Sequence, residues 1–229
     1  EGFGEVDHLI LDEAELTLPP FLEDLKNGNL KKIYRAPGFC DLHHTPAPSW
    51  DLINMKRYAS MTIQFSRGCP FNCDFCNVTI LFGRKPRMKT AQQVIAELDS
   101  IYDTGWRGNI FFVDDNFIGH KNKLKFDLLP AIISWMKKNN YPFFFMTETS
   151  INLADDEELM QLMVKAGFEA VFIGIETPND ESLIECNKPQ NRNRDLISSI
   201  KKIQQAGLEV QGGFIVGFDN DPPSIFEKI

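Results

Sequence analysis

Residues 67–78, RGCPFNCDFCNV, hold three of the five cysteines of this chain. Cys69, Cys73 and Cys76 follow MTIQF at 61–65, an apolar segment with the length of a buried strand. We therefore expect the three cysteines in the loop that follows this strand. A loop can wrap its thiolates around one metal centre, and short spacings keep the entropy cost of closure low.

Apolar segments of strand length recur after residue 58 and alternate with helical patterns. The further strands are expected at 109–115, 142–148, 170–176 and 210–218, and the helices at 90–105, 121–138, 155–167 and 194–207. The first of these helices begins with a capping box formed by Thr90 and Gln93. Strands that are apolar nearly throughout and alternate with helices predict a parallel sheet with right-handed crossovers. The fold class is therefore α/β, a parallel (β/α) partial barrel over residues 58–229 that binds ligands at the carboxyl ends of its strands.

Residues 1–57 follow a different pattern. We expect a strand and turn at 6–16, a short helix at 18–28 with prolines in its first turn, and a strand near 31–38. A proline-rich connector follows at 43–53. This is too little chain for a core of its own, so we interpret it as the tail of an upstream domain with a linker. The chain begins with Glu1 and ends as another helix begins, so we expect a fragment truncated after the fifth strand.

Composition excludes several classes of protein. Apolar content of 43% and charged content of 24% are those of an ordinary globular chain. The net charge of −8 argues against a mainly electrostatic nucleic-acid binder, although Arg84, Lys85, Arg87 and Lys89 form a local basic run. No stretch is long and apolar enough for a membrane span, and no signal peptide is visible. An odd number of unevenly spaced cysteines argues against a disulfide framework and predicts a reducing, cytoplasmic compartment.

The three clustered thiols could be incidental buried cysteines, or they could form one of two kinds of metal site. A structural zinc site needs four ligands, usually as two separated pairs, and Cys40, His43 or His44 could supply the fourth. A [4Fe–4S] cluster normally has four cysteine ligands, so three leave one iron open. An open coordination position is what makes a metal site catalytic. The alternative from another class of protein is a binding module with zinc or a cluster and no catalysis.

The spacing C-x3-C-x2-C, with aromatic Phe75 before the last cysteine, resembles the signature of the radical S-adenosylmethionine (SAM) superfamily. Its position after the first strand of a βα series agrees with that family. The resemblance implies a [4Fe–4S] cluster on Cys69, Cys73 and Cys76 whose open iron binds the amino and carboxylate groups of SAM. It further implies reductive cleavage of SAM to a radical that abstracts a hydrogen atom from substrate.

Other stretches are similar to the cobalamin-binding members of that superfamily, closest to the hopanoid C-2 methylase type. They include VDHLILDEAELTLPPFLEDLKNG, TPAPSWDLI, FGRKPRMKT, FFVDDNFIGH, MTETSINLA, VFIGIETP and GGFIVGFD. By this resemblance residues 1–57 are the C-terminal edge of a cobalamin-binding domain. His120 stands where the resemblance leads us to expect Asn.

Polar residues and glycines at the strand ends complete the candidate site. The resemblance implies a SAM pocket lined by Phe75, Asp115, Asn116, Thr147, Glu148, Glu176, Gly213, Ile215 and Gly217. Asp114 and its neighbours could instead cap a turn, the glutamates could pair with a buried cation, and the glycines could mark a bulge. Cys40 and Cys186 are interpreted as structural free thiols.

The resulting functional hypothesis is cobalamin-dependent methyl transfer to an unactivated carbon. Its cofactors would be a [4Fe–4S] cluster, SAM and cobalamin. Its partners would be a small-molecule or lipid substrate and an electron donor such as flavodoxin or ferredoxin, with no nucleic acid and no membrane span. The sequence does not separate this reaction from a cobalamin-dependent rearrangement such as ring contraction, and it does not name the substrate.

Overall fold

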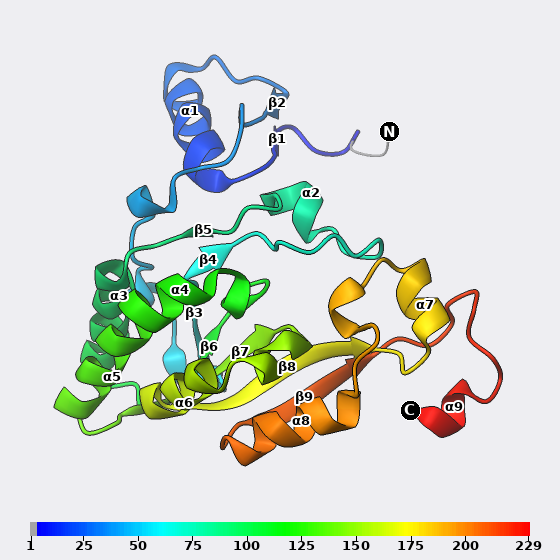
Figure 1. The fold of residues 1–229 in the computed structure, drawn as a ribbon. Coiled ribbons are helices and arrows are strands. Elements are labelled where there is room, and N and C mark those ends of the chain that lie inside the picture. The colour runs from blue at the N-terminus through cyan, green and yellow to red at the C-terminus, as the bar shows by residue number, and fades with distance from the viewer. Residues whose placement is uncertain (1–3) are drawn as a thin grey trace.

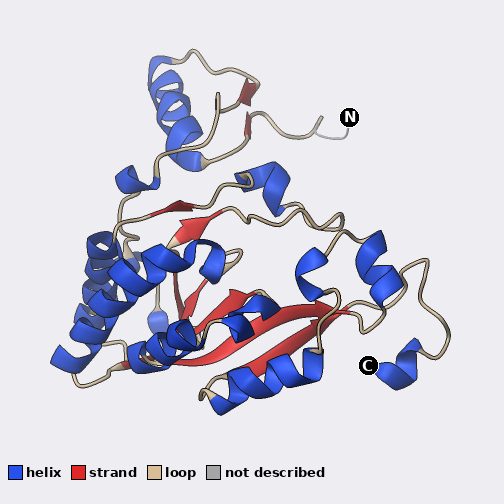
Figure 2. Ribbon diagram, in the orientation of Figure 1, coloured by secondary structure: helices blue, strands red, loops and turns tan. Residues whose placement is uncertain are grey.

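A five-stranded parallel sheet organises the chain. The computed structural model describes residues 4–229, and Figures 1 and 2 show the sheet curving through the middle of the molecule. Its strands are β3 (Met61–Ile63), β6 (Gly108–Phe112), β7 (Phe143–Thr149), β8 (Phe168–Glu176) and β9 (Glu209–Phe214). They lie in the order β3-β6-β7-β8-β9, and every neighbouring pair is parallel. The prediction of an α/β fold with a parallel partial barrel is confirmed.

Helices connect consecutive strands and cover the outer face of the sheet (Figure 1). They are α3 (Ala91–Asp103), α5 (Leu129–Lys138), α6 (Glu157–Ala166) and α8 (Leu196–Gln205). The Thr90 side chain accepts from Gln93 N–H and the Gln93 side chain accepts from Thr90 N–H, so the predicted capping box is confirmed. Gly167 ends α6 at φ +99°, a conformation that glycine adopts without strain.

Four phenylalanines pack together in the core between sheet and helices. Phe112, Phe117, Phe145 and Phe168 are each at most 1% exposed. Their ring centroids lie 5.0–5.3 Å apart in five of the pairs. Tilted and edge-on contacts at this distance add to the free energy of burying the rings. Phe117 comes from the segment after β6, so the core also fixes the start of the loop at that strand end.

Two expected elements are interrupted. The helix predicted at 121–138 is divided into α4 (Lys121–Lys123), a π-helical turn at Leu124–Leu128, and α5. Pro130 in the first turn of α5 has no N–H to donate, which removes one α-helical hydrogen bond at this junction. The strand predicted at 210–218 ends at Phe214, because Asp221 Oδ2 accepts from the N–H groups of Gly217 and Phe218 and turns the chain.

The N-terminal segment forms a small separate layer above the sheet (Figure 1). It contains β1 (Leu9–Ile10), α1 (Ala14–Asn27) and β2 (Ile33–Tyr34), with the two strands parallel. Of the strand and turn expected at 6–16, only Leu9–Ile10 form a strand, because α1 already begins at Ala14. Pro19 and Pro20 lie inside α1 rather than in its first turn. Single helical turns at Leu42–His44, Trp50–Leu52 and Met55–Arg57 lead into β3. The domain boundary after residue 57 stays a prediction.

Several short elements lie at the carboxyl ends of the parallel strands. Strands β4 (Ser66–Arg67) and β5 (Arg87–Met88) form an antiparallel pair, with α2 (Val78–Phe82) in the connection between them. Helices α7 (Asp180–Glu185) and α9 (Ile225–Lys228) follow β8 and β9. Among residues 4–229, no helix has the length and hydropathy needed to cross a bilayer.

Candidate functional site

The loop with the three cysteines leaves the sheet through a tight backbone crossing. Gly68 has φ +97°, and a Cβ atom there would lie 2.8 Å from the carbonyl oxygen of Gly83. The next residue, Cys69, donates its N–H to the same carbonyl at 3.3 Å. The β4–β5 pair therefore closes the base of the loop, and only glycine fits at its entrance.

Three consecutive residues at the end of β6 hold the entrance in place. Asp114 accepts from Phe65 N–H at 3.0 Å, Asp115 accepts from Gly68 N–H at 2.8 Å, and Asn116 donates to the Cys69 sulfur at 3.9 Å. Asp114 is 1% exposed and also accepts from the Ser66 hydroxyl. Burial raises its pKa to about 6. Asp114 therefore positions the loop and does not face the cavity beside it.

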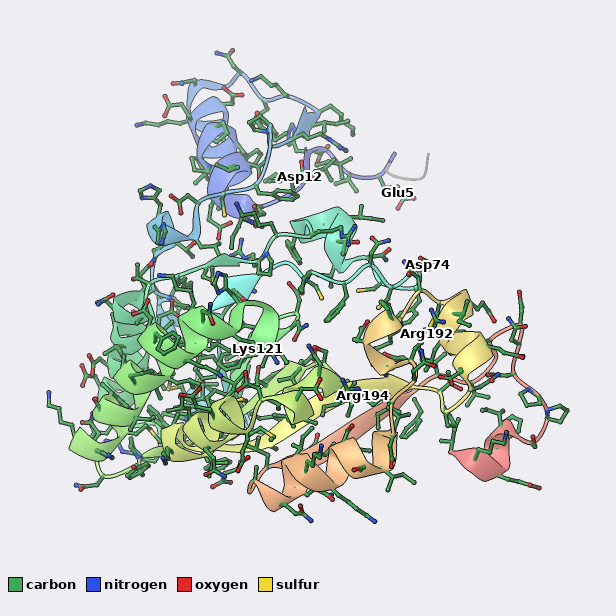
Figure 3. All side chains as sticks on the ribbon, in the orientation of Figure 1. Glu5, Asp12, Asp74, Lys121, Arg192 and Arg194 are labelled. Atoms are coloured by element: carbon green, nitrogen blue, oxygen red, sulfur yellow. The ribbon has the colours of Figure 1, made fainter. Side chains whose placement is uncertain are left out.

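The far side of the loop rests on the segment after β8. Asp74 N–H donates to Cys186 O at 3.0 Å, and Asn187 Nδ2 donates to Asn72 O at 2.7 Å. Figure 3 labels Asp74 at the outer part of the loop, on the side where α7 lies. The loop is thus fixed at its base by β4–β5 and at its tip by residues 186–187.

All three cysteines line one cavity of about 170 Å³ at the carboxyl ends of β6, β7 and β8. The other lining residues that the sequence singled out are Phe75, Asp115, Asn116, Glu148 and Glu176. Burial raises the pKa of the Cys69 and Cys73 thiols. It also raises the pKa of Asp115 and of Glu148, whose pKa the neighbouring Asp115 raises further. The site thus gathers thiols and carboxylates in a partly desolvated space.

Glu176 lies at the end of β8 in a buried ion pair. Its carboxylate binds Lys188, and both side chains are 9% exposed. The Lys188 ammonium also lies 5.7 Å from the ring centroid of Phe75, within cation–π range. Gly174 leaves room for the pair, because a Cβ there would clash with a carboxylate oxygen of Glu176. The expectation that a glutamate could pair with a buried cation therefore describes Glu176.

Four predicted pocket residues do not line this cavity. Thr147 is fully buried and its hydroxyl donates to Phe112 O at 3.0 Å, between neighbouring strands. Gly213 lies in β9, where a Cβ would meet the Phe172 ring at 2.6 Å. Ile215 donates its N–H to Glu176 O at 2.8 Å, and Gly217 has φ +109° in the turn beyond. These four residues stay predictions as SAM contacts.

The cavity also contains residues that the sequence analysis missed. They are Phe71, Thr149, Ser150, Phe172, Gly174, Lys188 and Gln190. Thr149 and Ser150 continue the polar end of β7, so the reasoning applied to Glu148 could have included them. Lys188 and Gln190 follow α7, and no sequence pattern relates them to cysteines more than 100 positions earlier.

The candidate fourth zinc ligands lie elsewhere. Cys40 is buried with its sulfur 3.7 Å from a guanidinium nitrogen of Arg67 and of Arg87, and it lines a different cavity. His43 and His44 are exposed beside Asp41. Across residues 4–229, no three His, Cys, Asp or Glu side chains converge on a single metal position. A cubane cluster does not need such convergence, because each cysteine binds a different iron.

The basic run and the unusual histidine have local structural roles. Arg87 pairs with Glu13 and Lys89 pairs with Glu97, while Arg84 and Lys85 are exposed. His120 accepts from Lys123 N–H at 3.4 Å and so caps α4. These contacts account for Arg87, Lys89 and His120 without a ligand.

Sequence comparison finds several curated relatives. The chain is 50% identical over 223 residues to an uncharacterized methyltransferase of Synechocystis sp., an alignment that covers 97% of this chain and 41% of the relative. It is 34% identical over 216 residues to the hopanoid C-2 methylase of Rhodopseudomonas palustris, with 94% and 41% covered. The chain thus spans about two fifths of the length of these relatives.

Structure comparison and family comparison agree on the fold. The cobalamin-dependent SAM radical enzyme OxsB, with aqua-cobalamin bound, superposes with a TM-score of 0.76 at 19% identity, over 93% of this chain and 34% of that one. The radical SAM methyltransferase TsrM from Kitasatospora setae has a TM-score of 0.62 at 16% identity, over 76% and 34%. The sequence profile of the radical SAM superfamily matches residues 63–229, which include the last residue of β3, the cysteine loop and the strands β6 to β9. The chain belongs to the radical SAM superfamily.

Proposed function

We propose that this protein holds a [4Fe–4S] cluster on Cys69, Cys73 and Cys76 and cleaves SAM reductively for cobalamin-dependent methyl transfer to an unactivated carbon. One observation carries the proposal: the three thiols and the polar ends of β6, β7 and β8 line the same cavity. A loop site with three thiols and no fourth cysteine fits a cluster that keeps one iron free for a ligand.

The surroundings of the thiols fit an anionic iron–sulfur group. Two amide side chains approach the sulfurs: Asn116 Nδ2 lies 3.9 Å from Cys69, and Gln190 Nε2 lies 3.8 Å from Cys73. N–H donors of this kind stabilise the negative charge of metal-bound thiolates. Burial raises the pKa of the Cys69 and Cys73 thiols, so these thiols would lose their protons only when metal binds. When bound, the cluster supplies the electron for SAM cleavage.

The same cavity has unsatisfied acceptors for a second ligand. Thr149 Oγ1 and Gln190 Oε1 are buried and have no hydrogen-bond partner within the described chain. Buried polar oxygens without a partner are costly, so a ligand with amino or hydroxyl donors would be stabilised here. The carboxylates of Asp115 and Glu148 favour a cationic ligand, and SAM carries a sulfonium. We assign these four residues to SAM binding.

The adenine side of the pocket is proposed on the family pattern. Phe75, Gly213, Ile215 and Gly217 would contact adenine, mostly through backbone atoms. Glu176 would act through its ion pair with Lys188, which orders the end of β8 beside the cluster loop. Asn116 and Thr147 would hold the strand ends on which the pocket is built.

The names of the relatives support methyl transfer. They include hopanoid C-2 and C-3 methylases and a bacteriochlorophyllide d C-12(1)-methyltransferase. The structural neighbour OxsB is described as cobalamin-dependent. We therefore propose cobalamin as a further cofactor, a small molecule or lipid as substrate, and flavodoxin or ferredoxin as electron donor. Residues 1–57 would form the edge of the cobalamin-binding part.

The test is anaerobic reconstitution with iron and sulfide, followed by EPR of the dithionite-reduced protein with and without SAM. We expect a [4Fe–4S]⁺ signal that changes when SAM is added and is lost in Cys73→Ala. Cys40→Ala is the matched control, because this buried cysteine lies outside the cavity, and its signal should equal that of the wild type.

Two outcomes would contradict the proposal. One is stoichiometric zinc with no cluster, and the other is a cluster whose spectrum ignores SAM. If the cluster forms and SAM is cleaved, the mass of the product formed with cobalamin separates methyl transfer from rearrangement, because only methyl transfer adds a carbon.

A further inference from the structure

We propose that Gln190 is a positioning residue that donates its side-chain N–H to the Cys73 sulfur and thereby raises the reduction potential of the cluster. The inference rests on the proposed function, because it requires the cluster on Cys69, Cys73 and Cys76. Gln190 lies in the connection between β8 and β9, far from the cysteine motif in sequence.

The geometry singles out Gln190 among the groups near the sulfurs. Its Nε2 lies 3.8 Å from Cys73 Sγ, across 117 positions of sequence. Asn116 is the comparable donor for Cys69 at 3.9 Å, but the same Nδ2 also donates to Ser150 Oγ at 3.1 Å. The amide N–H of Gln190 is directed to a sulfur without such a second contact in residues 4–229.

The backbone on both sides of Gln190 is fixed. Lys188 is held by the buried ion pair with Glu176, and Asn191 Nδ2 donates to Gly174 O at 3.0 Å and Ile175 O at 2.9 Å. Gln190 O itself accepts from Arg194 Nε at 3.3 Å. Because the backbone of this turn is already fixed, only the side-chain rotamers of Gln190 are restricted when its amide binds a sulfur. The turn is therefore a rigid support for one donor.

The chemical consequence follows from charge. Reduction adds one electron to the cluster and its thiolates, so the negative charge on Cys73 Sγ grows. A fixed N–H donor stabilises the reduced form more than the oxidised form, and hydrogen bonds to the sulfurs are a recognised control of iron–sulfur potentials. Removing the donor should lower the midpoint potential.

The test is an EPR-monitored redox titration of reconstituted wild type, Gln190→Leu and Gln190→Glu. Leu removes the donor at similar size, so the ratio of reduced to oxidised cluster at a fixed ambient potential should fall about tenfold, which is about 59 mV for a one-electron couple. Glu removes the N–H and adds a negative charge, so its potential should fall further. Gln204→Leu, an exposed glutamine on α8, is the matched control and should leave the potential unchanged.

The possible results separate this inference from the proposed function. The inference is supported if all variants bind the same amount of iron and the midpoint potential decreases from wild type to Gln190→Leu and further to Gln190→Glu. Equal iron content with equal potentials overturns it and leaves the proposed function intact. If Leu and Glu bind less iron but the bound fraction keeps the wild-type potential, Gln190 supports only the packing of the loop, and the inference is also overturned. A wild type that assembles no cluster would contradict the proposed function itself.

Discussion

Asp114 shows how a carboxylate just beyond a strand can order the cysteine loop without lining the cavity. It is buried, and both of its oxygens accept hydrogen bonds from the residues that lead into the first cysteine. A buried carboxylate that accepts several hydrogen bonds orders the donors, while desolvation raises its pKa. The order of the adjacent cysteine loop is thereby linked to the protonation of one acid.

The folded-state pKa of about 6 predicts a specific pH dependence. Between pH ~4 and ~6 the native protein keeps a proton on Asp114 that the unfolded chain has lost, so this residue makes the free energy of unfolding fall by about 3 kcal/mol as pH rises. Asp114→Asn should lack that fall. Urea unfolding of the metal-free protein at several pH values measures it. Asp51→Asn, at an exposed position, should retain the wild-type profile, and parallel profiles for Asp114→Asn and wild type would contradict the assignment.

At the scale of elements, the β4–β5 pair determines where the cysteine loop begins and ends. The two strands cover only Ser66–Arg67 and Arg87–Met88, so the crossing of Gly68 past Gly83 closes a long connection with few hydrogen bonds. A Cβ at Gly68 would press against backbone rather than against a flexible side chain. The closure of the cysteine loop by β4 and β5 therefore depends on Gly68.

Gly68→Ala should open this crossing. The positive φ and the contact with Gly83 O together should lower the free energy of unfolding by about 2 kcal/mol or more. The loss is measured by urea unfolding of the metal-free protein, and reconstituted Gly68→Ala should also bind less iron. Gly38→Ala has open space around its Cβ and should behave like the wild type. Wild-type stability and iron content in Gly68→Ala would show that the crossing tolerates a side chain.

The elements of the barrel were largely predictable, because their signals are local. The Thr90–Gln93 capping box and the apolar strands fix α3 and the parallel sheet within a few residues. The errors fall where tertiary contacts override the local pattern. α1 begins at Ala14, directly after Glu13, whose side chain binds Arg67 and Arg87 and does not cap the helix. β9 ends early because Asp221 turns the chain.

The candidate site was predictable only in part. The cysteine motif identified the loop, and polar residues at strand ends identified Asp115, Asn116 and Glu148 as neighbours of the cavity. Lys188 and Gln190 could not be found in this way, since their relation to the cysteines exists only after the sheet has curved. The burial of Asp114 and Thr147 was also missed. Alternation along one strand does not say which polar side chain faces the next strand.

At the scale of the molecule, buried charges join the N-terminal layer to the barrel. Glu13 at the start of α1 is bound by Arg67 and Arg87 at 3.0 and 2.9 Å, and it accepts from Cys40 N–H at 2.7 Å. Both arginines flank the cysteine loop in β4 and β5. The carboxylate is 2% exposed, so it cannot exchange these partners for water without local opening.

Glu13→Ala should therefore destabilise both parts. Two partly buried guanidinium groups lose their shared partner, and we expect the free energy of unfolding to fall by about 3 kcal/mol. Hydrogen exchange should show faster exchange in β4 and β5 as well as in α1. Glu23→Ala, on the exposed face of α1, is the control and should change neither quantity. If faster exchange is confined to α1, the ion pairs do not couple the two parts.

The hydrogen bond between Asn187 and Asn72 spans 115 positions of sequence, and it has a consequence for biosynthesis. When the three cysteines leave the ribosome, the residues that hold the tip of their loop have not yet been made. Contacts between such distant segments form late in folding, after the intervening strands have paired. The cysteines thus leave the ribosome as free thiols, and the proposed cluster would find its complete binding loop only after residues 186–191 have packed against it.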